Sequence, residues 1–141
     1  MEKYDNTMVD ISKNVNIMVL SGIPFKKVIL YIKMLSDIAA ASLEPKQTLN
    51  SLVLTFSAIY SKGDLKSHEL LQLMNAGYNP MPDLAYITGK QIANLMVEMT
   101  SGKISFDMIE KSLEHATSKD GRFYGMKMVR RCFKKNNRNI Q

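Results

Sequence analysis

Cysteine is almost absent from this sequence, and several other residue types are scarce. The single cysteine, Cys132, excludes an internal disulfide and is typical of a protein from a reducing compartment. Tryptophan is absent, and the seven glycines stand singly rather than gathering into a phosphate-binding loop. At 141 residues the chain fits one domain that can bury a modest core.

Long apolar runs are also absent. Each apolar run is interrupted well before the roughly 20 residues that a membrane-spanning helix needs. The first ten residues, MEKYDNTMVD, lack the basic-then-apolar order of a signal peptide. We therefore expect no membrane span and an intracellular protein.

Acidic residues are missing from the C-terminal end. All 13 lie at or before Asp120, whereas seven lysines and arginines follow it, so the total charge of +6 divides into −1 and +7. Such an end can bind nucleic acid weakly and non-specifically through its phosphates, or it can simply be a solvated terminus. The second interpretation is favoured, because one basic end without a nucleic-acid-binding fold is weak evidence. The candidate contacts for nucleic acid or another anionic partner are Arg130, Arg131, Lys134, Lys135 and Arg138.

Apolar residues at helical spacing dominate the rest of the chain, and strand-like alternation is almost absent. Glycine or proline interrupts each helical segment after a few turns. The sequence therefore predicts an all-α fold, a compact bundle of about five to seven short helices with glycine and proline joints.

The first half of the chain contains three predicted segments. Residues 1–13 are polar and predict a flexible N-terminal arm, followed by one or two helical turns that stop at Gly22. A helix should run from Pro24 to about Ser42, and Pro45 should break it. The next helix should start at Thr48 or Asn50, end at Gly63 and pack antiparallel to its predecessor.

The second half is organised by its joints. Helical stripes before Gly77 and Gly102 predict left-handed glycines, and Ser105 is a predicted N-cap. The prolines after Gly77 predict a rigid corner and then a brief helix. The structural joints are Gly77, Asn79, Pro80, Pro82, Gly89 and Gly102. The segment from Phe123 to Phe133 could extend the bundle or project as a basic amphipathic helix.

The helical stripes also predict which residues form the core. They are Val28, Ile32, Leu35, Leu52, Val53, Phe56, Leu70, Leu73, Leu95, Ile109 and Leu113. Most of the eleven methionines should fill this core, with Met81 and Met128 as the expected exposed exceptions.

Residues capable of chemistry are few and isolated. His68 and His115 have no partner at metal-ligand spacing, and exposed positions on helices explain them best. Glu69 beside His68 resembles part of a zinc-protease helix, but Gln72 stands where the second histidine would be. Cys132 has basic neighbours but no candidate base. We therefore expect no catalytic residue, no cofactor, no metal and no enzymatic activity.

One long stretch resembles a known family. It is LKSHELLQLMNAGYNPMPDLAYITGKQIANLMVEMTSGKISFDMIEKSLEHATSKDGRFYG, which is similar to the N-terminal region of phage tail tape-measure proteins. Together with the apolar segments before it, the resemblance covers about Gly22 to Gly125. The matching motif pieces are Glu69–Leu73, Ala76–Gly77, Asn79–Pro80, Thr88–Lys90, Ser101–Ser105 and Ala116–Gly125.

The resemblance implies structural work rather than catalysis. It suggests a tape-measure-like helical domain over residues 14–125 and a basic C-terminal tail over residues 126–141. Its implied partners are tail-tube subunits, tail-assembly chaperones and the distal tail hub. The implied location is the host cytoplasm during assembly, and the virion tail if the protein is incorporated.

The sequence departs from this family after Gly125. Family members continue for hundreds of residues of helical ruler, whereas this sequence ends at Gln141. At about 1.5 Å per helical residue it could not span a tail tube, so contacts with other proteins are the expected role. A fragment, a decayed prophage product and a domain retained for another role all fit. A small phage-encoded inhibitor or regulator that uses the helical domain and the basic tail is the second hypothesis.

Overall fold

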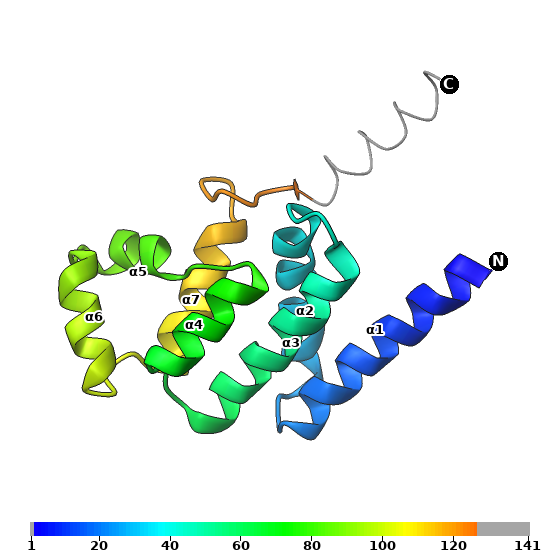
Figure 1. Cartoon of the computed structure of the whole chain (residues 1–141), viewed down its shortest axis with the longest axis horizontal. Coiled ribbons are helices and arrows are strands. Elements are labelled where there is room, and N and C mark those ends of the chain that lie inside the picture. Colours follow the sequence, from blue (N-terminus) through cyan, green and yellow to red (C-terminus); the bar gives the residue numbers. More distant parts are fainter. Residues whose placement is uncertain (1, 127–141) are drawn as a thin grey trace, which may run out of the picture.

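The computed structural model describes residues 2–126, and from Ile11 onward it describes their side chains. This part of the chain contains seven helices and no strand (Figure 1), which confirms the predicted all-α bundle. The helices are α1 (Glu2–Leu20), α2 (Phe25–Ala40), α3 (Pro45–Lys62), α4 (Ser67–Ala76), α5 (Met81–Thr88), α6 (Ile92–Thr100) and α7 (Phe106–Thr117).

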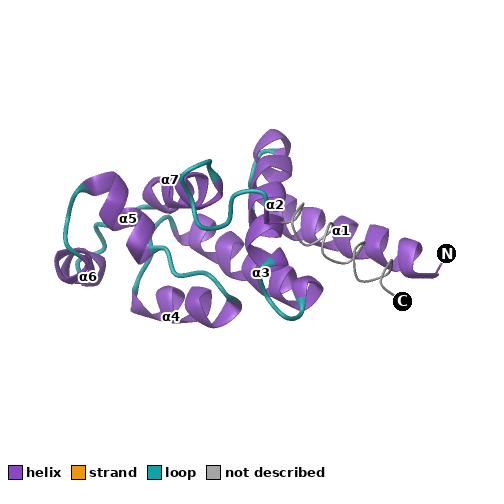
Figure 2. Ribbon diagram, turned by 90° about the horizontal axis from the view of Figure 1, so that it is seen from above, coloured by secondary structure: helices purple, strands orange, loops and turns teal. Residues whose placement is uncertain are grey.

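The helices are arranged with α1 and α6 at opposite ends of the molecule (Figures 1 and 2). Helix α3 packs on α1, α2 and α4, and α7 packs on α2 and α5. Helix α6 packs mainly on α5, at the end away from α1. The bundle therefore has a three-helix part, α1–α3, on which α4 packs, and α7 connects this part to a smaller one formed by α5 and α6.

The N-terminal segment differs from its prediction. Instead of one or two turns after an arm, α1 is a helix of 19 residues, so the boundary expected after Lys13 lies inside it. Asn14 and Met18, one turn apart, are buried, and Val15 packs against the core. The polar composition of residues 1–13 does not exclude a helix, because a helix needs only one apolar face to pack and its outer face can be polar.

Proline starts α3 rather than ending its predecessor. Pro45 is the first residue of α3, not a break before a start at Thr48 or Asn50. The first N–H groups of a helix have no partner within it, so proline loses no hydrogen bond there. Pro80 directly precedes α5 and Pro82 lies in its first turn, by the same rule.

The core follows the predicted stripes with few exceptions. All eleven predicted core residues are buried except Ile32, which is partly buried. Met81, expected to be exposed, is buried instead, because α5 turns its first residue into the bundle. At its centre an edge-to-face aromatic cluster joins α2, α3 and α7 through Tyr31, Phe56, Tyr60 and Phe106.

Two loops far apart in sequence hold α7 against the end of α3. The Leu65 N–H donates to the Ile104 carbonyl at 2.8 Å, and the Phe106 N–H donates to the Gly63 carbonyl at 2.9 Å. Ser105 then caps α7, with its hydroxyl oxygen accepting a hydrogen bond from the Met108 N–H. These bonds fix the start of α7, which supplies part of the site described below.

Gly77 ends α4 in a conformation that other residues rarely adopt. Its φ is 125°, and its N–H donates to the Leu73 carbonyl at 3.1 Å. A Cβ atom at this position would lie 3.2 Å from Thr48 Cγ2 of α3. Both the backbone angle and the neighbouring helix therefore favour glycine.

We expect Gly77→Ala to lower the free energy of unfolding by about 1 kcal/mol or more, because alanine is strained at positive φ. Gly63→Ala is the matched control, since Gly63 has a φ of 88° but nothing within 4 Å of its added Cβ. Urea denaturation of both variants separates backbone strain from crowding by Thr48. An unchanged or raised melting temperature for Gly77→Ala would contradict the prediction.

Candidate functional site

A carboxylate in the first turn of α5 is almost completely buried. Asp83 is 2% exposed, and three side chains from other parts of the chain contact it. Its Oδ2 atom accepts hydrogen bonds from the Tyr78 hydroxyl at 3.1 Å and from Arg122 Nη2 at 2.9 Å. Its Oδ1 atom lies 2.8 Å from His115 Nδ1. We call Tyr78, Asp83, Ser112, His115 and Arg122 the Asp83 network.

Four segments of the chain supply the Asp83 network. Tyr78 follows the glycine that ends α4, and Ser112 and His115 lie three residues apart on one face of α7. Arg122 lies in the loop after α7. This loop returns to the helix, and the Phe123 N–H donates a hydrogen bond to the Ala116 carbonyl at 2.9 Å. A Cβ at Gly121 would lie 2.2 Å from the backbone oxygen of Ala116, so this tight return requires glycine.

Arg122 also connects the network to the corner after α4. Its Nη2 atom donates to the Asn79 carbonyl at 3.2 Å, and its guanidinium lies 5.3 Å from the centre of the Phe123 ring. The Asn79 side chain accepts a hydrogen bond from the Met81 N–H at 3.1 Å, which shapes the start of α5. The corner and the loop after α7 thus hold each other in place.

Tyr78 is buried with its hydroxyl between two oxygens. That hydroxyl lies 3.1 Å from Asp83 Oδ2 and 3.2 Å from Ser112 Oγ, and Ser112 donates to the Ile109 carbonyl. Burial raises the pKa of Tyr78, and the negative charge of Asp83 raises it further. The phenol therefore stays protonated at neutral pH and donates to Asp83.

His115 is not the exposed helix histidine that the sequence suggested, whereas His68 is exposed. The His115 ring stacks on Tyr86 at a centroid distance of 4.2 Å and an interplanar angle of 23°. Its Nε2 atom is buried and has no hydrogen-bond partner among the described residues. An Asp–His pair is an arrangement used in general-base catalysis, but here Nε2, the ring atom that would face a substrate, is buried. The geometry suits a structural contact that holds α7 to α5.

The predicted site residues fall into three groups. Gly77, Asn79, Pro80 and Pro82 lie at the corner beside the Asp83 network. Gly89 ends α5 with a φ of 71°, and Gly102 follows α6 with a φ of 73°. The predicted anionic-partner contacts Arg130, Arg131, Lys134, Lys135 and Arg138 lie outside the described residues, as does Cys132.

Sequence reasoning missed the Asp83 network as a unit. In the sequence Asp83 is one residue of the brief helix predicted after the corner, and Arg122 is the first of the seven positive residues that follow Asp120. Asp83 lies 32 residues from His115 and 39 from Arg122, so no local spacing connects them.

A second buried carboxylate, Glu69, connects α3 to α4. It accepts hydrogen bonds from Lys62 Nζ and, at 3.3 Å, from the Lys66 N–H. Burial alone would raise the pKa of Glu69, but these bonds together with the charge of Lys62 outweigh burial and lower it. Glu69 therefore stabilises the fold as a carboxylate.

The Glu69 contribution should depend on pH in a defined direction. Because its pKa is lowered in the folded protein, the contribution is present above the ordinary value of about 4.5 and is lost as the pH falls through the folded value. Glu69→Gln should flatten the loss of stability between about pH 5 and pH 3, measured by thermal melting. Asp107→Asn, at an exposed carboxylate, is the control. An equally steep loss in Glu69→Gln and wild type would contradict the assignment.

Neither a metal-binding group nor a membrane-spanning helix is found in the described part of the chain. Among the side chains that the structure describes, residues 11–126, no group of three or more His, Cys, Asp or Glu could hold a metal ion. Within the same range no helix is both long and apolar enough to cross a membrane. Comparison of the chain with family models, curated proteins and solved structures finds no match.

Proposed function

We propose that this protein is a non-catalytic phage or prophage structural domain that acts in tail assembly through protein–protein contacts, like the N-terminal region of tape-measure proteins. One observation carries the proposal. Two pieces of the family-like pattern, Asn79–Pro80 and Ala116–Gly125, meet at the Asp83 network, where Arg122 bonds Asn79 across 43 residues. The contact gives these two pieces a common structural role at one end of the bundle.

The site itself supports a structural role over a catalytic one. Asp83 is bonded by Tyr78, His115 and Arg122 of its own network, and the His115 ring stacks on Tyr86. The proposed partners are the tail-tube subunits, the tail-assembly chaperones and the distal tail hub. The proposed location is the host cytoplasm during assembly, and the tail itself if the protein is incorporated.

Co-expression tests this proposal. The full chain would be produced with the tail-tube subunit and the tail-assembly chaperone encoded nearest to it, and complexes would be separated by size-exclusion chromatography. We expect a stable complex with at least one of the two and none with an unrelated capsid protein from the same genome. Absence of tail genes beside this one, or of any complex, would overturn the proposal.

A second candidate function rests on the charge at the end of the chain. The seven positive residues and no acid after Asp120 favour a small phage-encoded inhibitor or regulator that binds an anionic partner. A separately transcribed gene among defence-related neighbours would favour this candidate, and a place within a tail gene cluster would favour the first.

Deleting residues 127–141 separates these possibilities in solution. We expect the melting temperature to stay nearly unchanged, because the deletion removes few apolar side chains and its last eight residues, KKNNRNIQ, have little to bury. Any DNA binding by the full chain should weaken steeply as salt rises and should vanish with the deletion. The measurements are thermal melting and DNA titration at two salt concentrations. A truncated chain that unfolds, or that still binds DNA with sequence preference, would contradict this prediction.

A further inference from the structure

The outer face of α2 carries apolar side chains that the bundle leaves uncovered. Phe25, Ile29 and Leu30 are 63%, 53% and 41% exposed, and all three lie on one helix. The opposite face of α2 is buried in the core, as Val28, Tyr31 and Leu35 show. This helix therefore presents more apolar surface than its own fold requires.

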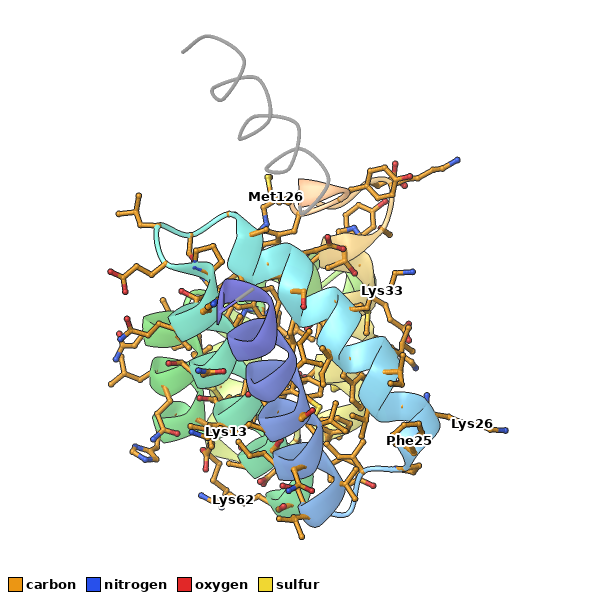
Figure 3. All side chains as sticks on the ribbon, turned by 90° about the vertical axis from the view of Figure 1, so that its right-hand side faces the viewer. Lys13, Phe25, Lys26, Lys33, Lys62 and Met126 are labelled. Carbon is orange, nitrogen blue, oxygen red and sulfur yellow. The ribbon has the colours of Figure 1, made fainter. Side chains whose placement is uncertain are left out.

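Two lysines lie among these apolar residues. At about 100° per helical residue, Phe25, Lys26, Ile29, Leu30 and Lys33 share an arc of about 140°, and we call these five residues the α2 outer face. The half-buried Asp37, one turn after Lys33, lies within the same arc. In Figure 3 Phe25, Lys26 and Lys33 project from α2 on the same side of the molecule, away from the bundle. Phe25, Ile29 and Lys33 form one row of the helix at intervals of four residues, and Lys26 and Leu30 form the next. Such rows pack into the grooves of another helix.

The two lysines of the α2 outer face differ from their neighbour Lys27 in their pairing. Neither Lys26 nor Lys33 forms an ion pair with any described residue, whereas the adjacent Lys27 bonds Glu110 at 2.8 Å. Residues 2–126 contain 13 lysines and arginines and 13 acidic residues, so the described part has no net charge. Attraction of carboxylates to Lys26 and Lys33 is therefore local to the α2 outer face, not an effect of a general positive field.

From these observations we infer that the α2 outer face binds an amphipathic helix of a partner protein, whose apolar stripe is bordered by aspartates or glutamates. Apolar contact with Phe25, Ile29 and Leu30 supplies the affinity, and Lys26 and Lys33 select carboxylates over lysines. A membrane surface fits less well, because binding to anionic lipid depends on a broadly positive surface and the described part is neutral. This inference rests on the proposed function and adds to it, because it specifies the kind of surface that the protein partner presents.

The exposed apolar patch at the other end of the molecule does not define a partner in this way. Ile92, Met96 and Val97 of α6 are exposed, but the nearby Lys90 is already paired with Glu98. That patch offers an internal control, because it is apolar and exposed without unpaired lysines among its side chains.

The test uses two synthetic helical peptides that differ only in charge. Both carry a leucine stripe, bordered by glutamates in one and by lysines in the other. Titration of the full chain with each peptide by fluorescence anisotropy should show at least tenfold tighter binding of the acidic peptide, about 1.4 kcal/mol. Equal binding of the two peptides would overturn the inference.

Variants locate the binding surface. Ile29→Glu should weaken acidic-peptide binding at least tenfold, and Lys26→Glu with Lys33→Glu should reverse the preference between peptides. Val97→Glu, an equivalent change on α6, should leave binding unchanged. Circular dichroism melting establishes that each variant is folded, and a variant that unfolds is replaced by Phe25→Ser.

Three results would overturn the inference. The first is equal loss of binding in Val97→Glu and Ile29→Glu. The second is binding that survives Ile29→Glu but disappears when Arg130, Arg131, Lys134 and Lys135 are changed to glutamine. The third is tighter, Ile29-dependent binding to phosphatidylserine vesicles, which would assign the face to a membrane. None of these results depends on tail proteins, so failure here remains distinguishable from failure of the co-expression test.

Discussion

Asp83→Ala should lower the free energy of unfolding by about 3 kcal/mol, the lower end of the range for breaking a buried charge pair. The substitution leaves the Tyr78 hydroxyl and His115 Nδ1 buried without their acceptor. Arg122 is about half exposed, so its charge can turn to water, which keeps the loss from being larger. Urea denaturation monitored by circular dichroism measures the change.

The matched control for this prediction is an exposed carboxylate in the same fold. Asp107 pairs with Lys111 at 3.4 Å with both side chains mostly in water, so Asp107→Ala should cost less than about 1 kcal/mol. A similar small loss in Asp83→Ala would show that the Asp83 network does not hold α5 to α7.

Leu73→Ala should lower the free energy of unfolding by roughly 2–5 kcal/mol, as truncation of a fully buried leucine does. Leu73 has no exposed surface. It lies in the second half of α4, shortly before the turn that leads to Tyr78. Removing its side chain leaves a cavity that the surrounding helices can close only in part. Thermal and urea denaturation report the loss.

Leu71, two residues earlier in the same helix, provides the control for Leu73. It is 59% exposed, so Leu71→Ala should change stability by about 0.5 kcal/mol or less. The two substitutions remove the same atoms from the same helix and differ only in burial. Equal effects would mean that α4 presents a different face to the core.

The sequence by itself determined the class of the fold and most helix ends. Helical spacing of apolar residues, without strand-like alternation, was enough to predict an all-α bundle. Ser105 caps α7 and Gly63 ends α3 because capping depends on a hydroxyl or on a positive φ within one turn of the chain. Ten of the eleven predicted core residues are buried for a similar reason, since each stripe lies on one helix.

Only the tertiary structure decided which apolar residues stay in water. Ile92 and Met96 continue the stripe of α6, yet both are exposed, because that helix packs mainly on α5 and buries only Leu95 and Met99. Met81 is buried for the converse reason, since the corner before α5 directs it inward. Periodicity identifies an apolar face, but the number of neighbouring helices decides how much of it is covered.

The Asp83 network was likewise decided by the tertiary structure. Asp83 and Arg122 each look like ordinary surface residues in sequence, and α7 brings them together by packing on α5. A buried carboxylate is stable only where several donors converge on it, and these donors come from residues as far as 39 positions away. Local sequence patterns determine the helices of this protein, whereas the Asp83 network forms only because the packing of those helices brings its residues together.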